Sequence, residues 1–429
     1  MDSPSAHSSQ DQQAKASVIQ AEDATEVQPV DELSSPIFVP ETPPSPKAAR
    51  LGWYAAFKKV LPTYILVHLV FFIITCLAVL FSIKDFSSQT LNITTLWQSW
   101  LRWDTYNFLA VAIKGYNPSW LTAFFPLYPL LVRCLMVLVH DPLIAGLIIA
   151  NLSGLGMLVV LYRLVQEDFD DKLASRTVLY LSVFPSAFFF AAAYSESLFL
   201  FLALLSFYYM RHSRWWLAGL FAALAALTRQ SGLFLLLPFC YEYLRQHDFK
   251  LKNIRFDIAS SLCMIAGLGI FALYCYYLFH DPLAFIHAEA RWDRKLSVPG
   301  YAVLRTVHAI MISQGVLSFQ SLRNMLDLLP DLFMGVLVVL CFVGPWKFQR
   351  NLWAYAIFAA TFFLFPQFFP FAGLYPLQSM TRYLLMVFPA FIVLAAIGKN
   401  RTLDTGYLLI SGSVLFFLLT QFLTGHWII

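Results

Sequence analysis

The feature that most constrains this chain is a series of long apolar segments that recur from residue 60 to the C-terminal end. Each approaches the ~20 residues that a helix needs to cross a hydrocarbon core of ~30 Å. Only 13% of the residues are charged and 59% are hydrophobic, whereas soluble domains carry about a quarter charged residues. The sequence therefore predicts an all-α polytopic membrane protein. Its clearest segments are Val60–Ile83, Leu143–Tyr162, Ile258–Phe279, Leu352–Phe369 and Tyr407–Phe422.

The N-terminal fifty residues have a different character. They are rich in Ser, Pro, Gln and acidic residues, with four prolines between residues 40 and 46, so residues 1–50 are predicted to form a disordered cytoplasmic tail. A secretory signal begins with a basic region and a short apolar core, and this polar start has neither. Val60–Ile83 is therefore expected to remain as a signal anchor at the start of a transmembrane domain that covers residues 51–429.

The cysteine and charge patterns exclude other classes of protein. The six cysteines are scattered through apolar segments, with no CxxC pair and no histidine at ligand spacing, so neither a zinc site nor a disulfide framework is indicated. The net charge of +4 is small, and no basic patch favours binding to nucleic acid.

Loop charges predict how the spans alternate, because Lys and Arg concentrate on the cytoplasmic side. Ala123–Val139 is apolar but contains Pro126, Pro129 and Arg133. If this segment lies at the outer face or re-enters without crossing, thirteen later basic residues are cytoplasmic and seven are outside, which favours about eleven spans with the N-terminus inside. The thirteen are Arg163, Lys172, Arg176, Arg211, Arg214, Arg245, Lys250, Lys252, Arg255, Lys347, Arg350, Lys399 and Arg401, and the seven are Arg229, Arg291, Arg294, Lys295, Arg305, Arg323 and Arg382.

In this topology the unusual polar segments share the outer side. The first outer loop, residues 84–142, contains Arg102, Trp103, Asp104 and Tyr106. Asp104 lies among aromatic residues near the lipid interface, where partial desolvation suits a carboxylate to act as a general base. Alternatively, Arg102 and Asp104 are solvated loop charges beside an ordinary interfacial belt of tryptophans.

Glu196 is the second candidate carboxylate. It follows Tyr194 and Ser195 where one apolar run gives way to the next, and charges that border hydrocarbon are rare unless they are paired or functional. The alternative is a helix start, with Ser195 as the cap and Glu196 in the first turn. The two interpretations are compatible.

Two arginines stand out because they oppose the charge rule. Arg229 ends one outer-facing segment and Arg382 begins another. A lipid phosphate would explain both, because guanidinium groups bind phosphate bidentately. A structural ion pair with Asp104, Glu196 or Glu289 is the alternative.

The long outer loop, residues 280–330, carries a third cluster around Glu289 and Trp292. Trp292 and Asp293 repeat the Trp-Asp pair of the first outer loop, although the flanking residues differ. Alternating charges on an amphipathic surface helix would give the same pattern.

Taken together, these motifs resemble the PIG-V family, the GPI mannosyltransferase 2 group and its bacterial relatives, within the GT-C class of membrane glycosyltransferases. The matching stretches run from about Trp100 to Tyr383, and the Phe-Phe-Pro-Leu-Tyr-Pro run looks closer to the bacterial members. They comprise Arg102–Asp104, Gly115–Tyr116, Phe125–Pro129, Phe184–Pro185, Tyr194–Ser197, Ala218–Gly232, Trp292, Pro299 and Pro376–Tyr383.

The resemblance implies a GT-C fold of about eleven transmembrane helices plus an outer-face juxtamembrane or re-entrant helix. It also implies a polyprenyl- or dolichyl-phosphate sugar donor, a glycan, glycolipid or protein acceptor, and no metal or other cofactor. The active site would face the periplasm in a bacterium, or the lumen of the endoplasmic reticulum in a eukaryote.

Residue roles follow from the same resemblance. Asp104 would be the general base of an inverting transfer, and Arg229 and Arg382 would stabilise the leaving phosphate. The remaining candidates would bind or orient substrate, with Trp103 stacking on a sugar face. They are Arg102, Trp103, Tyr106, Tyr194, Glu196 and Trp292.

Two other functions fit a polytopic chain. A flippase or transporter of lipid-linked sugars would also bury polar residues, but transporters commonly show paired repeats with broken helices, and no such symmetry is visible here. A non-catalytic assembly subunit would share the fold without the chemistry.

Overall fold

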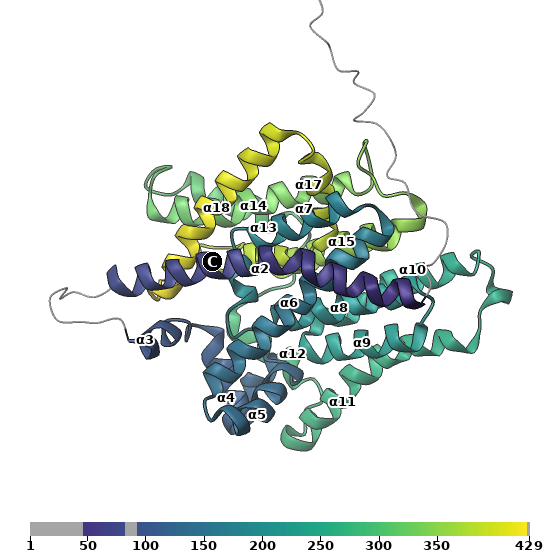
Figure 1. The fold of residues 1–429 in the computed structure, drawn as a ribbon. Coiled ribbons are helices and arrows are strands. Elements are labelled where there is room, and N and C mark those ends of the chain that lie inside the picture. Colours follow the sequence, from purple (N-terminus) through teal and green to yellow (C-terminus); the bar gives the residue numbers. More distant parts are fainter. Residues whose placement is uncertain (1–45, 82–91, 427–429) are drawn as a thin grey trace, which may run out of the picture. The chain divides into compact units, whose positions relative to one another are not determined.

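The computed structural model of the chain describes residues 46–81 and 92–426 (Figure 1). The expected tail lies outside the described residues except for its last five positions, which begin a helix at Pro46. Residues 82–91 of the first outer loop and the C-terminal Ile429 also lie outside them.

Within the described ranges the regular structure is helical, apart from one isolated bridge between Arg294 and Phe371. The α-helices are α2 (Pro46–Phe81), α3 (Ile93–Gln98), α4 (Asp104–Lys114), α5 (Leu127–Val139), α6 (Pro142–Asp168), α7 (Asp171–Ser182), α8 (Glu196–Arg211), α9 (Trp215–Thr228), α10 (Leu236–Gln246), α11 (Leu262–Phe279), α12 (Ala284–His287), α13 (Tyr301–Met311), α14 (Phe319–Leu340), α15 (Trp353–Gln367), α16 (Met380–Tyr383), α17 (Phe388–Ile397) and α18 (Arg401–Leu423). The short 3-10 segments are η2 (Ser119–Ala123), η3 (Ala187–Phe190), η4 (Gln230–Leu235), η5 (Leu251–Asn253), η6 (Phe256–Ser261), η7 (Ala288–Trp292), η8 (Arg350–Leu352) and η9 (Leu384–Met386).

Four helical segments are long and apolar enough to cross a membrane. They are Gly52–Phe81, Pro142–Asp168, Phe256–Phe279 and Arg401–Leu423, and a pair bent by 82°, Met380–Met386 with Phe388–Ile397, gives a fifth if it is one span. The chain is thus an all-helical membrane protein. A helix also lies in each of the eleven segments that were expected to cross. These helices are α2, α6–α11, α14, α15, α17 and α18. Several of them are too short or too polar to qualify as membrane spans by length and composition, so the number of eleven spans stays a prediction.

The helix α5 is the segment that decided the predicted topology. Its 13 residues extend about 20 Å at 1.5 Å per residue, which is less than the ~30 Å of a hydrocarbon core. The buried Tyr128 donates its hydroxyl hydrogen to the carbonyl of Gly146 at 3.0 Å, which ties α5 to α6. This geometry suits a juxtamembrane helix.

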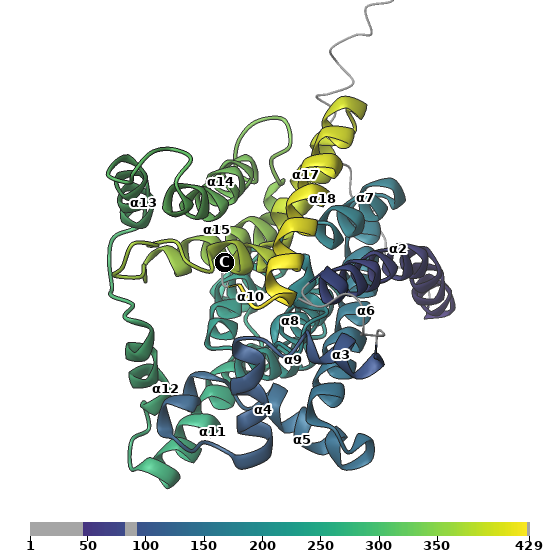
Figure 2. The ribbon, with the colours of Figure 1, turned by 90° about the vertical axis from the view of Figure 1, so that its left-hand side faces the viewer.

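The interior is built from helices that pack closely around α8. Helices α6, α8, α9 and α11 lie side by side in succession (Figure 2). Small residues permit the close approach that membrane helices need: a Cβ atom at Gly219 of α9 would meet the carbonyl oxygen of Ser260 at 2.2 Å. Helix α17 is almost entirely buried and packs against α7, α14 and α15.

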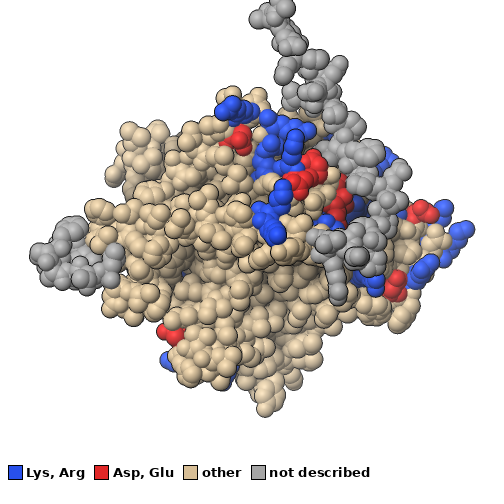
Figure 3. Space-filling view, in the orientation of Figure 1, with Lys and Arg blue, Asp and Glu red and all other residues tan. Residues whose placement is uncertain are grey.

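Charged side chains are unevenly spread over the face seen in Figure 3. Lys and Arg gather toward the end at which α2 begins, while most of the remaining face is uncharged. Exposed basic residues on the elements at this end include Lys58 and Lys59 of α2, and Lys250 and Lys252 after α10. The distribution has the one-sided form that the charge rule describes.

The long outer loop is shorter than expected, because α14 begins at Phe319 rather than after residue 330. Ser318 caps this helix by accepting a hydrogen bond from the Ser321 N–H. Asp327 and Asp331 are polar positions of α14, but both are buried within the protein. The helix therefore looks less apolar in sequence than a span that faces lipid.

Candidate active site

Four charged residues from four separate elements meet in one ion-pair network, here called the cavity cluster: Asp104, Glu196, Arg229 and Arg382. The Nη1 of Arg382 lies 2.7 Å from Oδ2 of Asp104, and its Nε lies 3.3 Å from Oε1 of Glu196. The Nη1 of Arg229 lies 2.7 Å from the same Glu196 oxygen. Glu196 therefore joins the two arginines, and Arg382 joins the two acids.

Each member stands where a helix begins or ends. Asp104 is the first residue of α4, after Trp103 with a positive φ of 49°, and Glu196 is the first residue of α8. A helix N-terminus favours a negative charge, so both acids suit their positions. Ser195 makes no side-chain capping bond to α8; its hydroxyl instead accepts a hydrogen bond from Arg229 at 3.2 Å.

Arg382 is held in place from beneath by α14. The neighbouring Thr381 donates from its hydroxyl to Oδ1 of Asp327 at 3.0 Å and from its backbone N–H at 3.4 Å. Thr381 and Asp327 are both buried. The short helix α16 begins after Ser379, whose φ of 68° turns the chain, and the bonds to Asp327 fix the orientation of that turn.

The four members differ in burial. The exposed fraction of the side chain is 1% for Glu196, 9% for Arg382, and 18% for both Asp104 and Arg229. Removing a charge from water is costly unless partners compensate it, so the two deepest members hold the network together. Asp104 and Arg229 have the larger exposed fractions and are therefore the two members more accessible to a ligand.

A cavity of about 1220 Å³ opens above this cluster. Its lining includes all four cluster members and also apolar residues, among them Phe234, Phe285, Phe362, Phe365 and Phe369. A concave site with a few convergent polar groups and an apolar wall is the usual form of a ligand site. A ligand with a charged head and an apolar body would match both the charged and the apolar residues of this lining.

The segment around η7 forms another wall of the cavity. Trp292 packs edge-on against Trp120 and Phe124, with ring centroids 6.2 and 5.9 Å apart. Arg294 donates to the carbonyl oxygen of Phe369 at 3.1 Å and to the hydroxyl of Tyr383 at 3.2 Å. These contacts fasten both ends of the wall, so its position relative to the cavity cluster is well defined.

Seven of the nine predicted site residues line this one cavity: Trp103, Asp104, Tyr106, Glu196, Arg229, Trp292 and Arg382. They come from segments almost 280 residues apart in sequence. The motifs of the first outer loop, of the start of α8 and around the two arginines therefore line one cavity. Their roles in binding and catalysis stay predictions.

The remaining two predicted residues, Arg102 and Tyr194, do not line the cavity. Arg102 donates through Nη2 and Nε to the carbonyl oxygen of Leu423, at 2.7 and 3.1 Å, and so ties the first outer loop to α18. The buried Tyr194 hydroxyl accepts a hydrogen bond from the Asp104 N–H at 3.2 Å. Tyr194 therefore supports the backbone of Asp104 from behind the cavity wall.

The cavity also contains polar residues that were not among the predicted site residues, notably Arg294, Gln378 and Tyr383. Arg294 could have been found by the signal that selected Arg229 and Arg382, since it is another arginine on the side where the charge rule expects few. The alternative interpretation of the segment around Glu289, one amphipathic surface helix, does not describe it, because α12 and η7 divide this segment.

Glu289 lies in this wall and faces the cavity. Burial raises the pKa of its carboxyl, and the negative Asp104 raises it further, while Arg294 and Arg229 oppose the shift. Within the described part of the chain, its carboxyl forms no ion pair or hydrogen bond. Glu289 thus differs from Asp104, whose Oδ2 is paired with Arg382.

Comparison with known proteins points to one family. "GPI mannosyltransferase 2" of Schizosaccharomyces pombe is 28% identical over 146 residues, which cover 33% of this chain and 31% of that protein. "GPI alpha-1,6-mannosyltransferase 2" of Rattus norvegicus is 34% identical over 151 residues, covering 31% and 29% of the two chains. The Cricetulus griseus protein of the same name is 31% identical over 205 residues, covering 42% and 40%.

These alignments span less than half the length of the three relatives. The family model described as Mannosyltransferase (PIG-V), however, matches residues 53–295, more than half of the chain. The matched region contains Asp104, Glu196 and Arg229 of the cavity cluster, and Arg382 follows it. The chain therefore belongs to the PIG-V mannosyltransferase family.

Proposed function

We propose that this protein is a membrane mannosyltransferase that moves a sugar from a polyprenyl- or dolichyl-phosphate donor to an acceptor hydroxyl at the non-cytoplasmic face. The observation that carries the proposal is Asp104, a partly exposed carboxylate fixed by an arginine in a large cavity that holds further arginines. Family membership supports the transfer of mannose. The relatives are GPI mannosyltransferases, and the proposed acceptor of this chain is a glycan, glycolipid or protein.

In the proposed step, Asp104 accepts the proton of the acceptor hydroxyl as its oxygen attacks the anomeric carbon. The bond between this carbon and the phosphate oxygen breaks, and its electron pair leaves with the polyprenyl phosphate. Attack from the face opposite the phosphate inverts the anomeric centre, as in other single displacements at a sugar. The proton then passes from Asp104 to water.

The geometry suggests a division of labour among the arginines. Arg382 is deeply buried and holds both acids, so we assign it chiefly to positioning Asp104. Arg229 and Arg294 also line the cavity, Arg229 is more exposed than Arg382, and their guanidinium groups suit the developing phosphate charge. Glu196 is paired with both Arg229 and Arg382, and Trp103, Tyr106 and Trp292 offer aromatic surfaces for sugar rings.

A transfer assay with the purified protein in lipid nanodiscs tests this function. Polyprenyl-phosphate mannose and the corresponding glucose donor are each supplied with lipid, glycan and peptide acceptors, and products are measured by mass spectrometry. We expect mannose transfer that Asp104→Asn slows by about 10²–10⁴-fold. Donor movement across liposomes without transfer to any acceptor would overturn the proposal in favour of a lipid-linked sugar transporter.

A further inference from the structure

Glu289 is a second carboxyl group in the cavity, and its surroundings differ from those of Asp104. Asp104 is paired with Arg382 at 2.7 Å. Glu289 lines the same cavity without an ion pair or hydrogen bond to any described residue. Two carboxyl groups in contrasting environments commonly perform different tasks in one site.

The wall around η7 fixes where Glu289 can act. The preceding Ala288 is buried, Trp292 packs on Trp120, and Arg294 is bonded to the segment that carries Phe369. The backbone of Glu289 is thus held on both sides while its side chain meets the cavity. Glu289, Arg229 and Arg294 line the same cavity, so this carboxyl is available to a ligand that the two arginines bind there.

We propose that Glu289 binds the donor as a neutral carboxylic acid, donating a hydrogen bond to a phosphate oxygen held between Arg229 and Arg294. This inference rests on the proposed function, since it assumes a phosphate-linked donor. A protonated carboxyl carries one O–H donor, whereas a carboxylate only accepts. An ionised Glu289 would instead place a negative charge against the phosphate and repel the donor.

The other charged groups near Glu289 define the alternatives. Packed against η7 are η2, which has no charged residue, and α12, which ends in His287. His287 is exposed and pairs with Asp281 at 2.7 Å. Arg294, Arg229 and Asp104 act on Glu289 across the cavity, and Arg291 of η7 lies over the ring of Trp120. Histidine is the side chain whose charge ordinarily changes between pH 5 and 8, so His287 is the neighbour to substitute as a control.

Equilibrium binding of polyprenyl-phosphate mannose to the protein in nanodiscs, without acceptor, measures the effect as pH is varied. This donor is a phosphodiester whose charge does not change between mildly acidic and mildly alkaline solution. Burial raises the pKa of Glu289. Its carboxyl is neutral below this pKa and ionised above it. Donor affinity should therefore fall about tenfold to a hundredfold on the alkaline side, the range expected for a hydrogen bond to a charged group.

Two substitutions of Glu289 distinguish a hydrogen bond to the donor from a purely structural role of the side chain. Glu289→Gln retains an N–H donor and cannot ionise, so its affinity should stay near the acidic wild-type value at every pH. Glu289→Ala should bind weakly throughout. Asp293→Asn is the matched control, since Asp293 is an exposed neighbour outside the cavity lining. His287→Gln tests the imidazole that lines the cavity beside Glu289, and both variants should keep the wild-type dependence on pH.

Three results would overturn the inference. They are affinity that does not change with pH in the wild type, an unaltered pH dependence in Glu289→Gln, and loss of the dependence in His287→Gln. In each of these the protein still binds the donor, so the proposed function survives. Absence of donor binding at every pH would remove the donor class and the proposed function together with the role of Glu289.

Discussion

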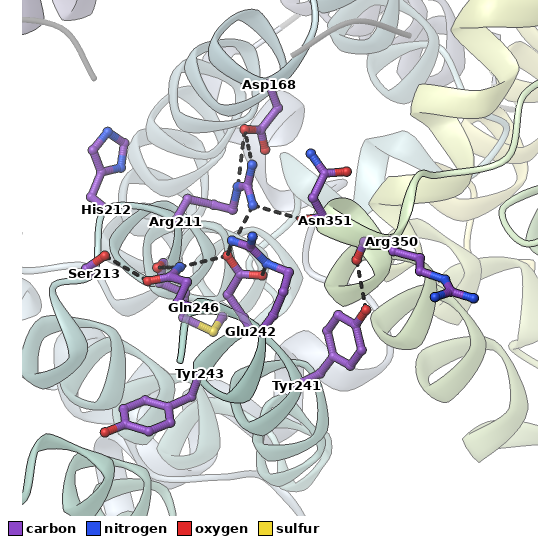
Figure 4. Close-up of polar contacts among 12 residues, drawn as sticks. Asp168, Arg211, His212, Ser213, Tyr241, Glu242, Tyr243, Gln246, Arg350 and Asn351 are labelled. Carbon is purple, nitrogen blue, oxygen red and sulfur yellow. Dashed lines mark hydrogen bonds and ion pairs between the residues drawn. The ribbon is translucent and has the colours of Figure 1, made fainter. Parts of the chain in front are cut away.

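Two ion-pair clusters of the same composition lie at opposite ends of helix α8. The cavity cluster includes Glu196, the first residue of α8, and the second cluster includes Arg211, its last residue. These two positions are about 22 Å apart along the helix. The second cluster, here called the closed cluster, consists of Asp168, Arg211 and Glu242 (Figure 4) together with Arg245, which is paired with Glu242. Each cluster thus has two acids and two arginines.

The charged groups of the closed cluster form their hydrogen bonds with one another and with neighbouring protein groups. Arg211 bonds Asp168 at 2.8 Å, Glu242 at 3.1 Å and the carbonyl oxygen of Asn351 at 3.0 Å (Figure 4). Glu242 also accepts hydrogen bonds from Arg245 and Gln246. None of its four members lines the large cavity or has a buried side-chain atom without a partner in the described part of the chain.

The cavity cluster is less complete. The Oε2 atom of Glu196 is buried without a hydrogen-bond partner among the described residues. Asp104 and Arg229 remain partly exposed to the cavity. The comparison shows that buried ion pairs by themselves do not identify an active site. What separates the two clusters is unused hydrogen-bonding capacity beside space for a ligand.

The first prediction places the two clusters on opposite sides of the membrane, an all-or-none effect. In a cysteine-free background, Lys250→Cys near the closed cluster should react with a membrane-impermeant thiol reagent only after the cells are opened. Tyr301→Cys in the outer segment should react in intact cells. Reaction of position 250 in intact cells would contradict the proposed orientation and its eleven spans.

The second prediction concerns chemistry in the cavity cluster. Asp104→Asn keeps the shape of the side chain but cannot accept a proton, so turnover should fall about 10²–10⁴-fold, the usual worth of a general base. Donor binding should persist, because the arginines that face the phosphate are unchanged. Single-turnover transfer and equilibrium binding measure the two quantities separately.

Glu196→Gln is the comparison variant for Asp104→Asn. It alters the other acid of the cavity cluster and should retain more turnover, because Glu196 is nearly fully buried. Near-normal turnover of a correctly inserted Asp104→Asn protein would remove Asp104 from the role of base.

The third prediction concerns the closed cluster, where the effect should be on stability. Arg211→Ala leaves Asp168 and Glu242 buried without their shared partner, and breaking a buried pair in this way typically costs about 3–5 kcal/mol. Unfolding in detergent should show this loss, while the folded fraction keeps its donor affinity. Arg214→Ala removes an exposed arginine three residues away and should change stability by less than about 0.5 kcal/mol. Loss of donor binding by folded Arg211→Ala would show that the two clusters are coupled.

Sequence reasoning located helices well where apolar runs dominate and less well where polar contacts set the ends. The run Leu143–Tyr162 lies within α6, but the helix continues to Asp168. Its start is capped by Asp141, which accepts from the Ile144 N–H. Its last turns are stabilised by an ion pair between Arg163 and Glu167. The cap and this ion pair are made by charged residues, so the length of the apolar run does not reveal them.

The site was predictable as a set of residues but not as an arrangement. Arg102 and Asp104 are two positions apart, yet the chain turns at Trp103, with a φ of 49°. Asp104 meets the cavity, and Arg102 reaches α18. The closed cluster was not predicted at all, because Arg211 and Arg245 read as loop charges. Arg211 is paired with Asp168, which is 43 residues away, and Arg245 is paired with the buried Glu242, three residues before it.

The fourth prediction returns to the cavity cluster and separates positioning from phosphate binding. Arg382→Lys can pair with Asp104 or Glu196 but cannot hold both in the present geometry. Asp104 would then shift, and a displacement of about 1 Å can reduce the rate ~10²-fold. We expect kcat to fall by about that factor while donor affinity changes little. An unchanged kcat with weakened donor affinity would instead make Arg382 a direct phosphate ligand.

The last and smallest effect is expected at Arg229. Its Nη1 is committed to Ser195 and Glu196, but the guanidinium remains partly exposed to the cavity. It can therefore keep Glu196 and still offer hydrogen bonds to a phosphate. In Arg229→Lys one ammonium must serve both partners without the planar fork, so donor affinity should fall about tenfold, the loss of a single hydrogen bond to a charged group. The kcat at saturating donor should be nearly preserved.

Arg291→Lys is the matched control for Arg229→Lys, because Arg291 lies over Trp120 and does not line the cavity. It should leave donor affinity unchanged. If Arg229→Lys and Arg291→Lys bind the donor equally well, Arg229 is a structural partner of Glu196. In that case the cavity cluster resembles the closed cluster at this position, and Arg294 is left as the arginine that meets the phosphate.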